Sequence, residues 1–171
     1  FMSVYANKVI GFDDKQLTSF LILSTVFAML GSWVIGWLVK YKGTIFSYWI
    51  VLWLWLTALV IIMVSQGEML FWLVGPLAGM GMGGVWVVSR AIVVELSPPE
   101  KIGEFFGIYG LAGKFASILG PLLWGTVVWI LQDTEIFKYR AAVGTLLLIT
   151  VITIFLFDRL QKQIPSREII G

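Results

Sequence analysis

The sequence has no cysteine and no histidine among its 171 residues. Their absence excludes a thiolate nucleophile, a histidine base and a metal site built from either ligand. Charged residues make up only 13% of the chain, whereas a soluble domain has about 25%. The net charge is +2, and its cations are scattered. We therefore expect no enzyme, no metal or cofactor, and no nucleic-acid partner.

Apolar residues, by contrast, dominate the sequence. They account for 59% of the chain, which also has nine Trp and eighteen Gly, a composition typical of helical membrane proteins. About 20 apolar helical residues cross a bilayer core about 30 Å thick. The chain offers five such runs, which neither alternate like strands nor carry a polar stripe. They are Leu17–Val39, Ile45–Val64, Met69–Leu96, Phe105–Leu131 and Ala141–Phe157.

The first ten residues are too short to cross the bilayer. We interpret Phe1–Ile10 as the end of a sixth helix whose beginning is missing. The predicted fold class is therefore all-α, a polytopic membrane protein with five complete transmembrane helices and the end of a sixth. Its first partner is the lipid bilayer.

Lysine and arginine in the loops predict the orientation, because cytoplasmic loops carry an excess of them. One side of the predicted membrane holds six of these residues and the other holds four. The richer side has Lys40, Lys42, Lys101, Arg159, Lys162 and Arg167; the poorer side has Lys8, Lys15, Lys138 and Arg140. We expect the richer side, and with it the carboxyl terminus, to be cytoplasmic.

Glycines recur in the third and fourth runs. Gly75, Gly79 and Gly83 form two successive small-xxx-small pairs, a spacing that lets membrane helices approach closely. The pair Gly120-Pro121 predicts a bend in the fourth run, because proline lacks the amide donor of the helix. These residues either serve tight packing alone or form faces that slide as a transporter alternates.

Lys114 is the most informative charge. It lies near the middle of the fourth run, where a lysine costs about 2.5–3.5 kcal/mol on insertion scales. We predict that it lines a solute pathway with Tyr109, Gly110 and Gly113, where it contacts an anionic group of the solute or a carboxylate on another helix. The alternative is that Lys114 extends its side chain to the membrane surface.

Four charges of both signs flank the turn between the third and fourth runs: Arg90, Glu95, Lys101 and Glu104. They are either solvated at the interface or form a cytoplasmic gate, in which Arg90 pairs with Glu95 or Glu104 in one state. Ser97, followed by two prolines and Glu100, is predicted to cap the start of the fourth helix.

The loop after the first run contains Gly36, Lys40, Lys42, Gly43 and Thr44. It resembles the Gly-x-Leu-x-Asp-x-x-Gly-basic loop of the major facilitator superfamily, which joins the second and third helices of each six-helix half. Lys40 stands near the place of the usual Asp, and Thr44 replaces the final basic residue. This departure puts the charge-relay role of the acidic residue in doubt.

A longer resemblance runs from Ser89 to Gly125. It contains Ser-Arg, Leu-x-Pro, Glu-Phe-Phe-Gly, Gly-Lys and Leu-Gly-Pro in order. In these elements the chain resembles bacterial relatives of the vacuolar amino-acid effluxer family, within the major facilitators. The resemblance implies that the five runs are helices eight to twelve of a twelve-helix secondary transporter in the bacterial inner membrane. It also implies a small organic solute, with an amino acid as the leading expectation.

A facilitator binds its solute between two six-helix halves. Residues 1–171 would supply the carboxyl-terminal half, short of most of its first helix, and we expect this chain to be inactive without an amino-terminal half. The alternative is a small structural or interaction subunit of a membrane complex.

Overall fold

The computed structural model describes residues 2–65 and 67–162, and every regular element within them is helical. Arg167 and Phe1 lie outside this part. Five helices are long and apolar enough to cross a membrane. They are α2 (Asp14–Lys42), α3 (Thr44–Val64), α5 (Val74–Leu96) with the short α4 (Glu68–Trp72) before it, α6 (Ile102–Ile130) and α7 (Phe137–Gln161). The predicted fold class is confirmed.

The segment before these helices is also helical. It comprises α1 (Met2–Tyr5) and a π-helical turn, Ala6–Ile10, and ends at Gly11 with φ of 88°. The phenol of the buried Tyr5 donates a hydrogen bond to the Ile62 carbonyl (3.1 Å), which ties this segment to the end of α3.

The structure differs from the sequence-based expectations at both ends of α5. The third run is divided at Leu73, whose amide donates to the Leu70 carbonyl, so α4 and α5 are separate helices. The predicted cap at Ser97 is wrong, because the Ser97 hydroxyl donates backwards to the Val93 carbonyl and closes α5. A short 3-10 turn, Pro99–Lys101, then leads directly into α6.

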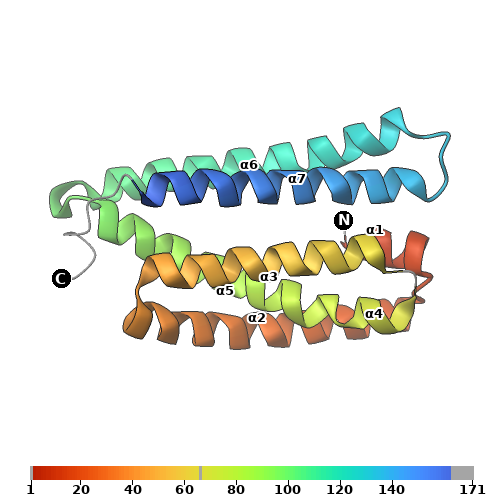
Figure 1. Ribbon diagram of the computed structural model, residues 1–171, viewed down its shortest axis with the longest axis horizontal. Helices are drawn as coiled ribbons and strands as arrows, with labels where there is room; N and C mark the ends of the chain where they lie inside the picture. The colour runs from red at the N-terminus through yellow and green to blue at the C-terminus, as the bar shows by residue number, and fades with distance from the viewer. Residues whose placement is uncertain (1, 66, 163–171) are drawn as a thin grey trace.

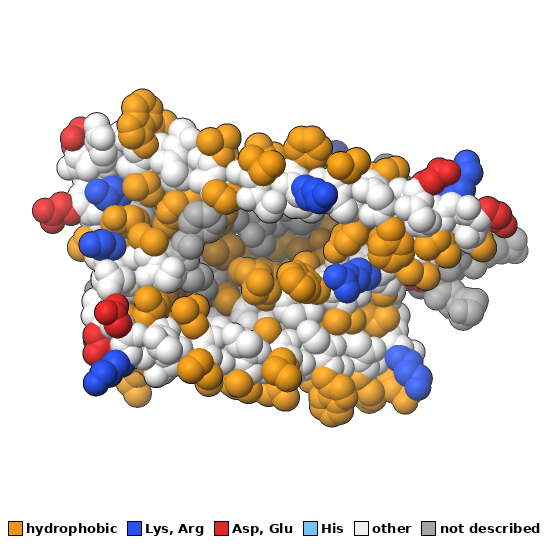
Figure 2. Space-filling view, turned by 180° about the vertical axis from the view of Figure 1, so that it is seen from behind, with side chains coloured by type: hydrophobic (Ala, Val, Ile, Leu, Met, Phe, Trp, Pro, Cys, Tyr) orange, Lys and Arg blue, Asp and Glu red, His pale blue; other side chains and the backbone are white. Residues whose placement is uncertain are grey.

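The helices form two layers (Figure 1). One layer contains α2, α3 and α5, and the other contains the antiparallel pair α6 and α7. Within the first layer α5 packs along both α2 and α3, and α3 also contacts α7. Figure 2 shows apolar side chains spread over the outer surface and charged ones mostly towards its two ends, as expected for a molecule surrounded by lipid.

The closest contact in the fold joins α5 to α2. An added Cβ at Gly79 would lie 2.2 Å from the Ser24 carbonyl oxygen, and one at Gly83 would lie 2.0 Å from that of Ala28. At Gly75 the nearest atoms, on Phe20 and Ser24, would be 3.1 Å away. The prediction that these three glycines serve helix packing is therefore consistent with the structure.

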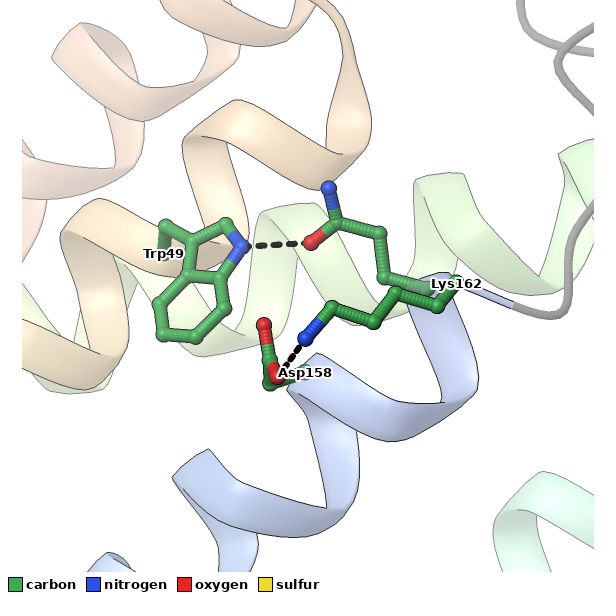
Figure 3. Close-up of polar contacts among 4 residues, drawn as sticks. Trp49, Asp158 and Lys162 are labelled. Carbon is green, nitrogen blue, oxygen red and sulfur yellow. Dashed lines mark hydrogen bonds and ion pairs between the residues drawn. The ribbon is translucent and has the colours of Figure 1, made fainter.

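At the opposite edge, α3 is joined to the end of α7 (Figure 3). The Trp49 indole N–H donates to the Gln161 side-chain oxygen (2.7 Å), and the Trp49 ring packs edge-on against Phe157. On the same turn of α7, Lys162 and Asp158 form an exposed ion pair (2.6 Å). A tryptophan near the end of a membrane-spanning helix, with its N–H hydrogen-bonded, is typical of a membrane interface.

Candidate functional site

Lys114 lies close to the middle of α6, which has 29 residues. It follows Ile102 by twelve residues, or about 18 Å at 1.5 Å per residue. The side chain is exposed in the isolated chain and has no hydrogen-bond or ion-pair partner within residues 2–65 and 67–162. Lys114 is therefore an unpaired cation near the middle of a membrane-spanning helix, where a lone charge costs the most free energy.

Lys114 belongs to a stripe of small residues that runs the length of α6. The members are spaced by three or four residues, which places them on one face of a helix: Gly103, Gly107, Gly110, Lys114, Ser117, Pro121 and Gly125. No atom of another element lies within 4 Å of an added Cβ at any of these glycines, or at Gly113 and Gly120. In contrast to the α5 glycines, this face of α6 is open among residues 2–65 and 67–162.

The helix continues through Pro121 without interruption. A bend at Gly120-Pro121 stays a prediction, as does any sliding of the glycine faces.

A polar contact links α5 to α6 one turn before Lys114. The Ser89 and Tyr109 hydroxyl oxygens are 2.8 Å apart. Because Ser89 donates its hydrogen to the Val85 carbonyl (2.5 Å), the Tyr109 phenol donates to Ser89. Arg90, the next residue of α5, lies over the Trp86 ring, with 5.9 Å between the guanidinium carbon and the ring centroid. Tyr109 thus joins α6 to α5, whereas Arg90 packs on a residue of its own helix.

We predict that Tyr109→Phe lowers the free energy of unfolding by about 0.5–1.5 kcal/mol, the net value of one hydrogen bond. Ser89→Ala should cost a similar amount, and the double variant should cost less than the sum, because both changes remove one shared bond. Thermal unfolding in detergent would measure this, with Tyr41→Phe on the exposed side of α2 as the control. Fully additive losses would contradict the assignment.

The four predicted gate residues do not pair with one another in this structure. The only ion pair within the described part of the chain joins Lys162 to Asp158. Glu95 instead accepts a hydrogen bond from the hydroxyl of the buried Thr44 (2.5 Å), while Lys101 and Glu104 are exposed. A gate in which Arg90 binds Glu95 or Glu104 in another state stays a prediction.

Thr44 belongs to the loop that resembles the facilitator signature. Gly43 has φ of 86° and ends α2 by donating its amide to the Val39 carbonyl, which sets the sharp reversal into α3. Lys40 lies against Tyr41, and a Cβ added at Gly36 would lie 3.8 Å from the Val87 side chain of α5. Thr44 stands where the facilitator signature has its final basic residue. Its side chain thus bonds this loop to α5.

Figure 2 shows a hollow between the two layers, walled by apolar side chains with Lys and Arg side chains at its edges. Two adjoining cavities underlie it, with volumes of about 510 Å³ and 550 Å³. The first lies against α2 and α5, and the second lies between α3 and the α6–α7 layer. Leu21 and Trp55 line both cavities. Sequence reasoning missed these two residues because each is one apolar residue within an apolar run.

Comparison with known proteins places this architecture in a family. The sequence model described as Major Facilitator Superfamily matches residues 1–168. The chain is 45% identical over 53 residues to "Uncharacterized MFS-type transporter YxiO" of Bacillus subtilis, which is 31% of this chain and 12% of that protein. It is 32% identical over 97 residues to "Autophagy-related protein 22" of Kluyveromyces lactis, which is 57% of this chain and 19% of that protein.

A third relative, an "Uncharacterized protein" of Aquifex aeolicus, is 26% identical over 149 residues, which is 86% of this chain and 39% of that protein. The chain therefore spans well under half the length of these relatives. No solved structure matches it. The family match covers nearly every residue and agrees with five helices that are long and apolar enough to cross a membrane, so the chain belongs to the Major Facilitator Superfamily of membrane transporters.

Proposed function

We propose that this chain is the carboxyl-terminal half of a secondary transporter that moves a small organic solute, an amino acid first among the candidates, across a bacterial inner membrane. The observation that carries the proposal is Lys114, a cation without a partner at the middle of α6 in the described structure. A carboxylate is the natural counter-ion for such a lysine, and every amino acid has one.

The open face of α6 supports a second, amino-terminal half as partner. Facilitators hold their solute between two halves that rock about the binding site. The stripe of small residues on α6 would let a helix of the other half approach closely on both sides of Lys114. Lys114 would then lie between the halves, in a cavity rather than in lipid.

The proposed orientation has the carboxyl terminus in the cytoplasm. The α2–α3 and α5–α6 turns lie at the same end of the bundle as the end of α7 (Figure 1). That end has the larger share of lysine and arginine in the loops, which supports the assignment.

We predict that the 171-residue chain alone transports no amino acid, because it would supply only one wall of the cavity. The purified chain and the full-length protein that contains it would be reconstituted in liposomes and given labelled amino acids, with and without a proton gradient. Flux through the full-length protein alone is expected. Robust uptake by the short chain would contradict the two-half proposal, and no flux through either would favour the alternative, a structural or interaction subunit.

A further inference from the structure

Trp55 holds a central place in the fold. It lies near the middle of α3 and packs against both apolar clusters of the core. It also lines both cavities beneath the hollow of Figure 2. Together with Leu21, Trp55 therefore lies where the two cavities meet.

The position of the Trp55 ring depends on a glycine of the neighbouring helix. An added Cβ at Gly81 of α5 would lie 3.1 Å from the Trp55 indole nitrogen. That contact is tight, so any residue larger than glycine at this position would displace the ring. The ring edge that bears the N–H thus lies directly against α5.

The indole N–H of Trp55 has no hydrogen-bond partner among the described residues. The only fully buried, unpaired side-chain atom in that part of the chain is Arg140 Nε, so the Trp55 nitrogen is not completely enclosed by protein. A donor in such an apolar place favours a ligand that has an acceptor, because an unpaired polar group costs free energy when water is excluded.

The three hydroxyl groups that line the α2–α5 cavity have already used their hydrogens. The hydroxyls of Ser24, Thr25 and Ser32 each donate to a carbonyl of their own helix, four residues earlier. The facing wall on α5 presents Met82 and Trp86. The free donors of this mainly apolar cavity are therefore the indole N–H groups of Trp55 and Trp86, and Trp55 is the more buried of the two. The cavity volume of about 510 Å³ is in the usual range for small-molecule sites.

We propose that Trp55 is a specificity-determining residue of a solute subsite, which takes a solute with an acceptor oxygen and an apolar body, such as an amino acid with an aliphatic or aromatic side chain. The indole N–H donates to the oxygen, and the apolar body packs between α2 and α5. This inference rests on the proposed transport function. A lipid chain has no acceptor oxygen, so it does not satisfy the donor.

The depth of Trp55 agrees with that of Lys114. Trp55 follows the start of α3 at Thr44 by eleven residues, or about 16 Å, and Lys114 follows the start of α6 by about 18 Å. Both helices start at the same end of the bundle (Figure 1). A cation and a neutral donor thus both lie several turns inside their helices from that end.

The test compares Trp55→Phe with Trp53→Phe in the full-length protein. Phenylalanine keeps an aromatic ring and removes only the N–H and part of the surface, and Trp53 is on the exposed side of α3 outside both cavities. Proteoliposomes would take up labelled L-leucine and L-phenylalanine. We expect Trp55→Phe to raise KM about tenfold with kcat within twofold, and Trp53→Phe to change neither.

The outcomes separate this inference from the proposed function. No flux of any amino acid through the unaltered protein overturns the proposed function and the subsite with it. If Trp55→Phe and Trp53→Phe transport with the same KM and kcat, the subsite alone is overturned. A fall in the kcat of Trp55→Phe at constant KM also overturns it. A lower kcat at constant KM would mean that Trp55 supports the fold or bonds to a neighbouring helix.

A second measurement applies if Trp55→Phe does not fold. The chain has no cysteine, so a cysteine introduced into it is its only thiol. Thr25→Cys lies on the cavity wall, and Val26→Cys is exposed beside it outside the cavity. In a full-length background without other cysteines, L-leucine should slow maleimide labelling at position 25 at least about threefold and leave position 26 unchanged. Equal labelling with and without L-leucine at both positions would overturn the subsite.

Discussion

Replacing Gly83 with alanine is expected to lower the free energy of unfolding by about 2 kcal/mol or more, towards the upper end of the range for overpacked cores. The added Cβ would lie 2.0 Å from the Ala28 carbonyl oxygen of α2. Because the obstacle is backbone, no side-chain rotation relieves it, and α2 and α5 must separate along their length. The remaining fraction of monodisperse protein after heating in detergent measures the loss.

Gly144→Ala is the matched control. Gly144 is also inside a long helix, α7, but its added Cβ would meet only the end of the Met63 side chain, at 4.0 Å. Alanine favours helix more than glycine does, so this variant should be as stable as the unaltered protein or slightly more stable. If Gly83→Ala and Gly144→Ala unfold at the same temperature, the close α2–α5 contact is wrong.

The sequence was sufficient to predict the class of fold and four of the five spans to within four residues at each end, because a bilayer imposes one length and one composition on any helix that crosses it. The predictions from sequence were wrong at the two ends of α5, where local backbone hydrogen bonds set the helix boundary. The break at Leu73 comes three residues before Pro76, which has no amide to donate to the Trp72 carbonyl, and the prediction of one continuous run overlooked this signal. At the other end of α5, Ser97 bonds back to Val93 rather than forward. There the hydroxyl is satisfied in either arrangement, so pattern alone could not choose between them.

The glycines show the same limit. Gly79 on α5 and Gly107 on α6 each belong to a stripe of small residues, yet Gly79 packs against α2 and Gly107 meets nothing within the described structure. Spacing identifies a face that can be approached closely; it does not identify the partner. Trp55 gave no signal at all, since its role comes from the meeting of α3, α5 and two cavities.

Thr44 is an intermediate case. Its place in the loop was visible as a departure from the facilitator signature, and the structure shows that this departure coincides with a direct bond to Glu95. A polar residue where a basic one is usual could have indicated a partner able to accept a hydrogen bond. The location of that partner, fifty-one residues later on α5, follows only from the fold.

Replacing Lys114 with glutamine should reduce kcat/KM for amino-acid uptake by the full-length protein by about 10- to 100-fold. The reason is the loss of a charge-assisted hydrogen bond to the solute carboxylate, worth about 1.5–3 kcal/mol, where tenfold corresponds to 1.4 kcal/mol. Lys114→Arg keeps the cation and should retain part of the activity. Uptake of labelled L-leucine into proteoliposomes measures all three proteins.

Two controls test whether the charge itself acts on the solute. Lys162→Gln removes a lysine of an exposed ion pair at the end of α7 and should leave uptake unchanged, since such pairs contribute little. L-Leucinamide lacks the carboxylate, so any uptake of it should be insensitive to Lys114→Gln. If Lys114→Gln takes up L-leucine as well as the unaltered protein does, or loses both compounds equally, Lys114 does not bind the carboxylate, and the cation in the middle of α6 must serve the contact between the two halves instead.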